Sequence, residues 1–465
     1  MKNRYFDLIE QTFYFPQEGF DIENGYLDFN GIPLIHLIRK YGTPFKLTYL
    51  PRIGAQIKRA RNLFNRSMKN VGYNGNYYYC YCTKSCHFRF IVEEVLQNGA
   101  HIETSSSFDI DLIRKLYMHG KLDKSEIILC NGYKAGEYGK KICKLINEGF
   151  KNVMPILDNK EELSIYNEGV ENGCKIGIRV ATEEEPNFQF YTSRLGIRSS
   201  EVIQFYKDHL ANNPKFKLEL LHFFVDTGIK DTIYYWSEFK KVLKIYCELK
   251  KICPDLHAID IGGGLPIRNS LGFEYDYSYM INEIVKQIKI ACTDEGIPEP
   301  DIFSEFGKYT VGESGATIFS VIGEKQQNDS ELWYMVDNSL MNTIPDSWGI
   351  SERFILLPIN KWYNDFTRVN IGGITCDNGD FYNSEVHENQ VYLPASGKND
   401  TEPLYLGFFH TGAYQDALSG YGGIKHCLIP SPKHILVDRD EQGNIVDRLY
   451  QDEQEAEDML KILGY

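Results

Sequence analysis

The sequence predicts an α/β protein in which a (β/α)8 barrel of the TIM type is joined to an antiparallel β domain. From about residue 75 to residue 307, short apolar runs rich in strand-forming residues alternate with amphipathic helical stretches. There are eight such runs, and they must pair in parallel, because each strand is followed by a helical crossover. After about residue 318, strand-like runs separated by turn residues replace this pattern.

The eight apolar runs are the expected barrel strands, and two of the stretches between them have clear helical periodicity. Apolar residues recur at helical spacing over 88–96 and again over 281–292, so each stretch has one face to bury. Gly99 is expected to end the first of these helices. An open, doubly wound sheet is the structural alternative. The runs are 76–84, 100–106, 126–132, 152–159, 175–181, 220–228, 257–264 and 301–307.

The change of pattern divides the chain into three segments. Residues 1–45 precede the barrel pattern and are expected to join the β domain. Residues 46–318 are expected to form the barrel, and residues 319–465 the C-terminal β domain, with a short helix in 453–465. A chain of 465 residues suits two domains.

Composition excludes several classes of protein. A formal net charge of -14 argues against nucleic acid or an anionic membrane as the main partner and mildly favours a cationic small molecule. No run approaches the length of a membrane span, and the first residues do not resemble a secretory signal. Eleven scattered cysteines are typical of reduced thiols rather than of a disulfide framework. We therefore expect a cytoplasmic globular protein.

Unusual residues follow the barrel runs, where reactive groups of this fold belong. Gly262, Gly263 and Gly264 end the seventh run, and three successive glycines let backbone N–H groups approach an anion closely. A tight turn is the alternative interpretation, but the nearby cation Lys308 favours phosphate. Other residues at the ends of runs are Lys84, Glu103, Arg179, Asp226, Thr227, Gly228, Glu305, Phe306 and Gly307.

Two of these residues, and one turn of the second domain, have side chains that can take part in a reaction. Lys84 can form a Schiff base with an aldehyde cofactor, or it can simply reach out of the barrel mouth. Glu305 can pair with a protonated ring nitrogen, or form a structural salt bridge. Cys376 and Asp377 lie in a glycine-flanked turn. There they can donate a proton and receive a cationic substrate, or form an Asx turn beside a buried thiol.

The cysteines near Lys84 do not indicate a metal. Cys80, Cys82 and Cys86 lack further cysteine or histidine residues at the spacings of a four-ligand site. Alternation along a strand explains them better, and His87 and His410 are equally unconvincing as ligands. We expect no metal site.

Together these motifs resemble the fold type III, alanine-racemase-like decarboxylases that use pyridoxal phosphate. This family includes ornithine, diaminopimelate and biosynthetic arginine decarboxylases. Within it, the chain is most similar to the bacterial arginine decarboxylases, on the segments ILCNGYK, LHFFVDTGIKDTIYYW and the ending MLKILGY. Five motifs stand in the family order over nearly the whole chain, namely Tyr81–Ser85, Asp260–Gly264, Glu305–Lys308, Cys376–Asp377 and Gly412–Tyr414.

The resemblance implies a role for each residue of the site. Lys84 holds the pyridoxal phosphate covalently, Glu305 pairs with its ring nitrogen, and Cys376 returns a proton after carbon dioxide leaves. Asp377 and Asp337 bind the distal cation of a basic amino acid, and Asp346 is a further candidate for this role. The remaining cofactor-binding residues are Glu103, Arg179, Phe224, Thr227, Gly262, Gly263, Gly264, Gly307, Lys308 and Tyr414.

The reaction most closely implied converts L-arginine to agmatine and carbon dioxide in polyamine biosynthesis. Ornithine, lysine and diaminopimelate are alternative substrates, and a racemase is a further enzyme alternative. A non-catalytic regulator that binds pyridoxal phosphate is the other class, although retention of Lys84 and Cys376 argues against it.

The resemblance also implies shared active sites. In relatives, the residues equivalent to Cys376 and Asp377 come from the other subunit, which implies a head-to-tail homodimer or a larger homo-oligomer. Two departures concern the cofactor. Phe224 stands where most relatives have a histidine that stacks on the ring, and Lys308 stands where they have an arginine.

Overall fold

A computed structural model describes residues 4–183, 192–385, 390–396 and 400–465. The chain forms two compact units. Unit 1 contains Met1–Arg52, Ile267–Glu274 and Val311–Tyr465, and unit 2 contains Ile53–Pro266 and Tyr275–Thr310. The first bound differs from the expected residue 46, because the strand Phe45–Tyr49 is paired within the sheet of unit 1 rather than with the barrel.

Unit 2 is a closed barrel of eight parallel strands, so the predicted barrel is confirmed and the open sheet is wrong. The ring closes where β12 pairs in parallel with β5, with Ile302 opposite Tyr77. Every expected run overlaps one of the strands, although β9 and β10 begin before the runs expected for them. These are β5 (Tyr77–Cys82), β6 (His101–Thr104), β7 (Ile127–Cys130), β8 (Asn152–Leu157), β9 (Cys174–Arg179), β10 (Phe216–His222), β11 (Ala258–Asp260) and β12 (Asp301–Glu305).

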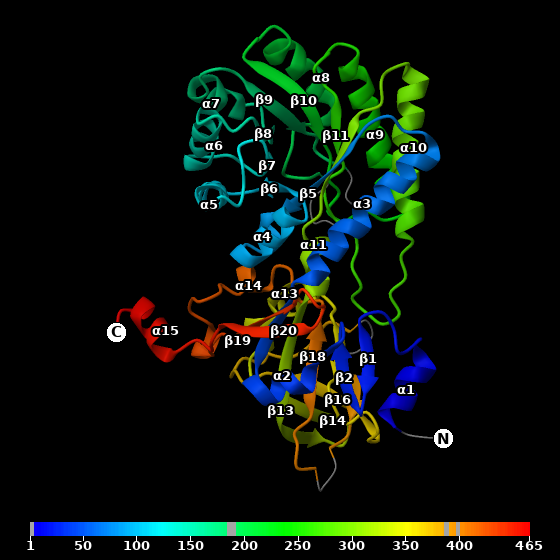
Figure 1. Cartoon of the computed structure of the whole chain (residues 1–465), viewed down its shortest axis with the longest axis vertical. Coiled ribbons are helices and arrows are strands. Elements are labelled where there is room, and N and C mark those ends of the chain that lie inside the picture. Colours follow the sequence, from blue (N-terminus) through cyan, green and yellow to red (C-terminus); the bar gives the residue numbers. More distant parts are fainter. Residues whose placement is uncertain (1–3, 184–191, 386–389, 397–399) are drawn as a thin grey trace. The chain divides into compact units, whose positions relative to one another are not determined.

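Helices cover the outside of this barrel (Figure 1). The periodic stretches are helical as predicted, and α10 buries Ile281, Ile284 and Ile288 on one face. Gly99 follows the C-cap of α4 with a φ of 69°, a left-handed conformation that glycine adopts without strain. The helices are α3 (Pro51–Val71), α4 (Arg89–Gln97), α5 (Ser107–Met118), α6 (Glu137–Asn147), α7 (Glu162–Gly169), α8 (Val202–Phe205), α9 (Ile233–Lys250) and α10 (Tyr277–Glu295).

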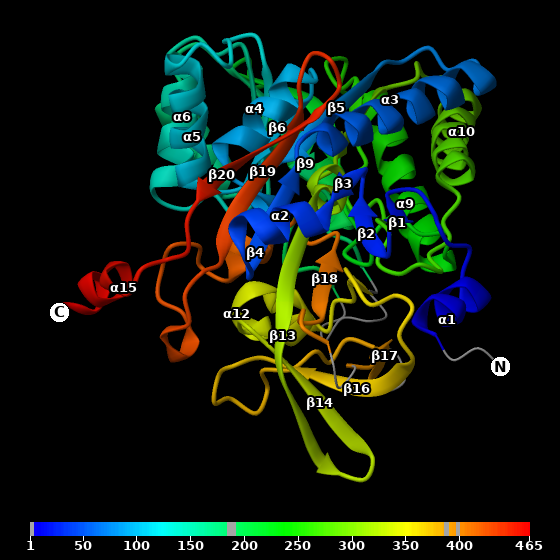
Figure 2. The ribbon, with the colours of Figure 1, turned by 60° about the horizontal axis from the view of Figure 1, so that its bottom comes forward.

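Unit 1 is built on a nine-stranded, mostly antiparallel sheet, as the alternating pattern predicts. Its strands run in the order β17-β16-β14-β13-β4-β19-β20, and β18 pairs with both β13 and β15. Figure 2 shows the long β13–β14 hairpin of this sheet. The strands are β4 (Phe45–Tyr49), β13 (Gly315–Asn328), β14 (Glu331–Val336), β15 (Ile355–Pro358), β16 (Phe366–Gly372), β17 (Val391–Pro394), β18 (Tyr405–Phe409), β19 (Lys433–Arg439) and β20 (Ile445–Gln451).

The beginning of the chain packs into the core of unit 1. Phe15 stacks on the buried Trp362 with ring centroids 5.3 Å apart, and Tyr5 contacts the same ring edge-on. The predicted terminal helix is confirmed as α15 (Ala456–Leu463). Among the described helices, none is long and apolar enough to cross a membrane. The other elements of the unit are α1 (Tyr5–Thr12), β1 (Phe20–Glu23), β2 (Tyr26–Phe29), β3 (Ile32–Pro33), α2 (Leu34–Tyr41), α12 (Leu340–Thr343), α13 (Pro345–Ile350) and α14 (Gln415–Leu418).

Candidate active site

A layer of polar side chains lies at the carboxyl ends of the barrel strands. An apolar core cluster on the barrel strands includes Cys80, Leu129, Leu220, Ala258 and Phe303. Side chains two residues apart on a strand point to the same side, so the next layer is set by the residue two positions further on. It consists mainly of buried polar groups, namely Cys82, Asn131, Asp158, His222, Asp260 and Glu305, joined by Glu103 on β6 and Arg179 on β9.

Glu305 receives hydrogen bonds from two directions. The side-chain amide of Asn131 donates to its Oε1 at 2.5 Å, and Nε2 of His222 lies 3.2 Å from its Oε2. Burial by itself raises the pKa of Glu305, but the charge and hydrogen bond of His222, followed by the charge of Lys84, lower it to about 2. Glu305 is therefore an ionised carboxylate in a buried site, which is the state needed to pair with a cation.

Asp260 and His222 keep Glu305 in this state. Ligand atoms of Asp260, His222 and Glu305 all lie within 4.8 Å of one another. Burial and then the charge of Glu305 raise the pKa of Asp260 well above its usual value, so Asp260 carries the proton of the two carboxyl groups. Burial lowers the pKa of His222, while the charge and hydrogen bond of Glu305 oppose that effect. Because ionised Glu305 can only accept, Nε2 is the nitrogen that bears the hydrogen.

Lys84 and Glu103 lie on neighbouring segments, and the charge of Lys84 acts on the carboxyl group of Glu103. Lys84 lies in the 3-10 turn Thr83–Ser85 directly after β5, with an exposed side chain, while Glu103 is fully buried on β6. Burial raises the pKa of Glu103 to about 7, although the charge of Lys84 opposes this rise. The end of β5 thus places an accessible amine near a carboxyl group that titrates close to neutral pH.

At the predicted anion-binding turn, neighbouring backbone segments lie very close to one another. A Cβ at Gly263 would lie 2.4 Å from the carbonyl oxygen of Glu305, and one at Gly264 would lie 2.7 Å from Cα of Gly228. Gly262 and Gly264 have φ values of 67° and 92°, which side-chain-bearing residues rarely adopt. Glycine is required at these positions by contact as well as by conformation. The turn therefore exposes backbone rather than side chains at the barrel mouth.

Phe224 lies beside this turn. Its Cδ2 would be 3.0 Å from a Cβ at Gly262, and the guanidinium carbon of Arg179 lies 5.6 Å from the centre of its ring. Burial lowers the pKa of Arg179, while the charges of Asp158, Glu305 and Glu103 oppose that effect. Phe224 thus offers an aromatic face at the position where the resemblance implies a stacking ring.

Three further predicted residues follow strands of the same barrel. Thr227 is half-buried in the loop after β10, and Lys308 is half-buried at the start of the short helix Lys308–Val311 after β12. A Cβ at Gly307 would lie 3.0 Å from Cβ of Ser85, so this glycine permits close packing beside the turn of Lys84. The structure gathers all the predicted residues of unit 2 at the carboxyl ends of the strands, which supports the predicted location of the site.

Five predicted residues belong to unit 1. Cys376 is exposed, not buried, and Asp377 forms the Asx turn that was one alternative, accepting from the backbone N–H of Gly379 at 2.7 Å. Both carboxylate oxygens of Asp337 accept from Ser320, whose backbone N–H and hydroxyl donate at 3.0 and 3.2 Å. The other two are Asp346, which is buried against Gln415, and Tyr414, which precedes α14 with a φ of 68°.

The interpretation of the cysteine triplet needs one correction. Cys80 and Cys82 are buried two residues apart on β5, as alternation predicts, but Cys86 follows the turn of Lys84 and is outside the strand. His87 and His410 have structural partners. His87 is 3.1 Å from Asp109, and Nδ1 of His410 is 2.6 Å from the carbonyl oxygen of Arg268.

Sequence reasoning missed His222 and Asn131, and it assigned no role to Asp260. A signal for His222 was present, because it stands two positions before Phe224 and so points to the same side of its strand. Similarly, Asn131 lies two positions after the inward-facing Leu129. Extending the period-2 pattern by one step at each strand end identifies these residues as members of the layer.

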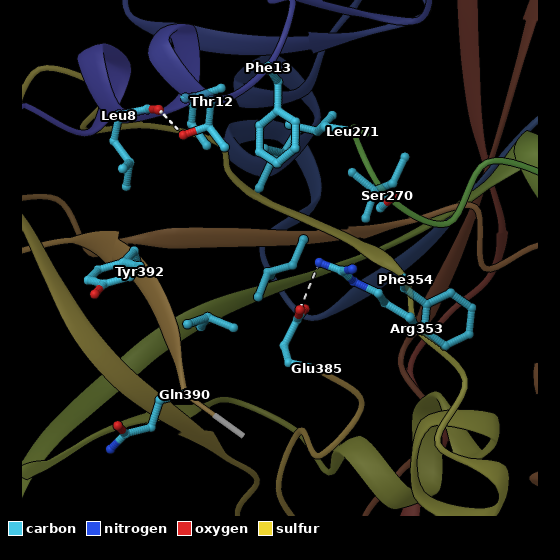
Figure 3. A pocket seen from close by; sticks show the side chains of 15 residues that line it. Leu8, Thr12, Phe13, Ser270, Leu271, Arg353, Phe354, Glu385, Gln390 and Tyr392 are labelled. Atoms are coloured by element: carbon cyan, nitrogen blue, oxygen red, sulfur yellow. Dashed lines mark hydrogen bonds and ion pairs between the residues drawn. The ribbon is translucent and has the colours of Figure 1, made fainter. Parts of the chain in front are cut away.

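A hollow in unit 1 does not contain a layer of polar side chains like that of the barrel. It lies between α1 and segments that include β15 and β17, and Figure 3 shows its mostly apolar lining with the ion pair of Arg353 and Glu385. The nitrogen and oxygen of that pair are 2.7 Å apart. No predicted site residue lines this hollow. The barrel mouth therefore remains the candidate active site.

Comparisons with known proteins agree with this assignment. Residues 54–312, more than half of the chain, match the family described as "Pyridoxal-dependent decarboxylase, pyridoxal binding domain". The biosynthetic arginine decarboxylase of Marinobacter nauticus is 23% identical, over 89% of this chain and 81% of that protein.

Two solved structures have a similar fold. That of the biosynthetic arginine decarboxylase from Campylobacter jejuni has a TM-score of 0.80 at 21% identity, covering 99% of this chain and 90% of the other. That of the diaminopimelate decarboxylase from M. jannaschii, in complex with L-lysine, has a TM-score of 0.78 at 16% identity, covering 95% and 96%.

Proposed function

Because the chain belongs to the pyridoxal-dependent decarboxylases, we propose that it converts L-arginine to agmatine and carbon dioxide in polyamine biosynthesis. The observation that supports this substrate most directly is the similarity to arginine decarboxylases. The relative from Marinobacter nauticus, which has that name, is similar over 89% of this chain. The barrel mouth supplies the chemistry that such a reaction needs.

The residues of the barrel fit pyridoxal phosphate, which has a phosphate, an aldehyde and a ring nitrogen. The Gly262–Gly264 turn leaves no room for side chains, so its backbone N–H groups can bind a phosphate. Lys84 offers an accessible amine for the aldehyde. Among the described residues, Nδ1 of His222 and Oδ1 of Asn131 are buried without a hydrogen-bond partner. A bound polar ring can therefore find partners in this layer.

Glu305 is the residue that we propose controls the cofactor's electronic state. Pyridoxal phosphate, when bound, acts as an electron sink for the electrons left behind by carbon dioxide. The carboxylate of Glu305 stabilises a proton on the ring nitrogen, because an opposite charge favours the charged form. The hydrogen bonds from Asn131 and His222 hold this carboxylate in place and ionised.

Proton return and substrate recognition are assigned to unit 1. We propose that the exposed thiol of Cys376 delivers a proton to Cα, and that Asp377 binds the guanidinium group of the substrate. Asp377 is the most suitable of the three candidate aspartates, because its side chain is 43% exposed. Asp337 is half-buried and accepts hydrogen bonds from Ser320 through both carboxylate oxygens, and Asp346 is buried against Gln415.

Assembly and location form part of the same proposal. We propose a head-to-tail homodimer, or a larger homo-oligomer, in which Cys376 and Asp377 serve the barrel of another subunit. All eleven cysteines are free thiols, which agrees with a reducing compartment such as the cytoplasm.

The test is a carbon dioxide release assay with arginine, ornithine, lysine and diaminopimelate, together with an absorbance spectrum of the holoenzyme. We expect arginine to have the highest kcat/KM. We expect Lys84→Ala to lose steady-state turnover, with Lys69→Ala, a lysine in the last turn of α3, as a matched control.

Three results would contradict parts of this proposal. A higher kcat/KM for ornithine, lysine or diaminopimelate would refute the choice of arginine. Substantial turnover by Lys84→Ala would refute the role of that lysine. A protein with the cofactor's absorbance that releases no carbon dioxide from any of the four would favour the non-catalytic regulator.

A further inference from the structure

Three potential metal ligands of unit 1 lie together outside the barrel. Ligand atoms of Cys376, His426 and Cys427 are all within 4.8 Å of one another, and the three side chains are exposed. The two sulfur atoms are 3.4 Å apart. Nε2 of His426 also lies 3.7 Å from Oδ2 of Asp377. Two thiols and an imidazole at these separations are the donor types that a thiophilic metal ion prefers.

One short segment anchors the turn that carries Cys376. The hydroxyl of Ser339 and the backbone N–H of Met341 both donate to Oδ1 of Asp380, each at 3.1 Å. The other oxygen of Asp380 accepts from the backbone N–H of Thr375 at 3.1 Å. The turn before and after Cys376 is therefore tied to residues 339–341.

The same segment anchors the turn that carries the other two ligands. The side chain of Asn342 donates to the carbonyl oxygen of His426 at 2.9 Å and accepts from its backbone N–H at 3.3 Å. The side chain of Asn338 donates to the carbonyl oxygen of Pro430 at 3.3 Å. Because residues 338–342 bind both turns, the ligand set is preorganised although its members are about 50 positions apart.

The backbone at this site is strained. Cys427 and Leu428 have φ values of 54° and 53°, a left-handed conformation that is unfavourable for residues other than glycine. Such strain persists where the surroundings hold the residue in place, and it is concentrated at functional sites. Here it accompanies a thiol that faces a second thiol.

We propose that Cys376, His426 and Cys427 form a binding site for a thiophilic divalent cation, with Zn²⁺ as the fitting example. In a tetrahedral zinc site with bonds of about 2.3 Å to sulfur, the two sulfur atoms are about 3.8 Å apart. The observed 3.4 Å requires a shift of only a few tenths of an ångström. Three protein ligands leave the fourth position for water or for Asp377.

This site gives the cation control over the reaction, an inference that rests on the proposed function of Cys376. A thiol must lose its proton to bind zinc, and the proton is released to solvent. Cys376 bound to the metal then has no proton to deliver and no freedom to move. Zinc binding therefore inhibits decarboxylation, and removal of the metal by a chelator restores it.

The binding site is tested with Co²⁺, which reports thiolate ligands by a sulfur-to-metal charge-transfer band. The full-length holoenzyme is titrated under a non-thiol reductant, and the band is read as a difference from the metal-free spectrum. We expect one equivalent to saturate a two-thiolate band, with about half the amplitude in Cys427→Ser. We expect His426→Asn to weaken binding by at least tenfold. A wild-type band no larger than that of Cys427→Ser would overturn the site.

Inhibition is measured separately, as carbon dioxide release with Zn²⁺ at increasing concentration. We expect the wild type to be inhibited and Cys427→Ser to remain active at the same concentrations, whereas Cys253→Ser, which changes a buried thiol outside the ligand set, should be inhibited like the wild type. A two-thiolate Co²⁺ band without inhibition by zinc would overturn the regulatory role and contradict Cys376 as the proton donor. Equal inhibition of wild type and Cys427→Ser would place the inhibitory zinc elsewhere.

Discussion

Gly263→Ala tests the close approach on which the predicted anion-binding turn depends. The new Cβ would lie 2.4 Å from the carbonyl oxygen of Glu305, whereas real Cβ atoms are essentially never closer than 3.0 Å. The two backbone segments must therefore separate by at least 0.6 Å, the difference between these two distances. That movement is resisted, because Glu305 donates its N–H to the carbonyl oxygen of Gly262 at 2.9 Å, and its own carbonyl accepts from the thiol of Cys82.

Overpacking of this kind costs about 1–3 kcal/mol of unfolding free energy. For a unit of this size each kcal/mol lowers Tm by about 2–4 °C, so we expect a fall of several degrees. We also expect weaker binding of pyridoxal phosphate, because the turn can no longer approach the phosphate closely. Thermal unfolding by circular dichroism measures the first effect, and titration of apoenzyme with pyridoxal phosphate measures the second.

Gly120→Asn is the control in the same unit. Gly120 has a φ of 64°, no atom lies within 4 Å of the place that a Cβ would take there, and asparagine tolerates the left-handed conformation. We expect it to change Tm and cofactor affinity little. If Gly263→Ala matched Gly120→Asn in both measurements, the argument that the turn is a tightly packed phosphate cradle would be refuted.

Three further predictions concern buried titratable residues. Lys134→Met leaves Glu162 buried without the cation 3.2 Å away, so the free energy of unfolding should fall by about 3 kcal/mol. The double variant Lys134→Met/Glu162→Leu should recover part of this loss, as measured by thermal denaturation. Burial lowers the pKa of His410 to about 4. The contribution of His410 to the free energy of unfolding is therefore fully present above the unfolded pKa of 6.5, and it is lost as pH falls toward 4. That loss reaches about 3 kcal/mol, and His410→Gln should flatten the dependence of Tm on pH in this window; parallel curves would contradict this. His222→Phe removes a hydrogen bond to the ionised Glu305, which is worth about 1.5–3 kcal/mol. The Kd for pyridoxal phosphate, measured by absorbance titration, should therefore rise by tenfold or more. An unchanged Kd would show that His222 does not support that carboxylate.

The barrel could be predicted because its signals are local. Each run of apolar residues and the helix after it lie within about 30 consecutive positions, and alternating strands and helices admit few topologies. The carboxyl ends of parallel strands meet at one end of the barrel, so Lys84, Glu103 and Glu305 could be expected near one another. The limit of the barrel at residue 46 was less accurate, because the strand Phe45–Tyr49 has the same local pattern whichever sheet it joins.

The partners of the predicted residues could not be deduced in the same way. Glu305 binds Asn131 and His222, which precede it by 174 and 83 positions. Which strand residues meet inside a barrel depends on the register of every strand around the closed ring, and no local pattern encodes that register.

The sequence by itself determined the order of strands and helices, the glycines of the Gly262–Gly264 turn, and which strand ends carry an amine or a carboxyl group. These properties depend on residue type and short-range periodicity. Only the tertiary structure decided that Glu305 is ionised while Asp260 holds the proton, and that Cys376 faces Cys427. Ionisation and ligand geometry depend on burial and on charges a few ångströms away, and folding brings those groups together from distant parts of the chain.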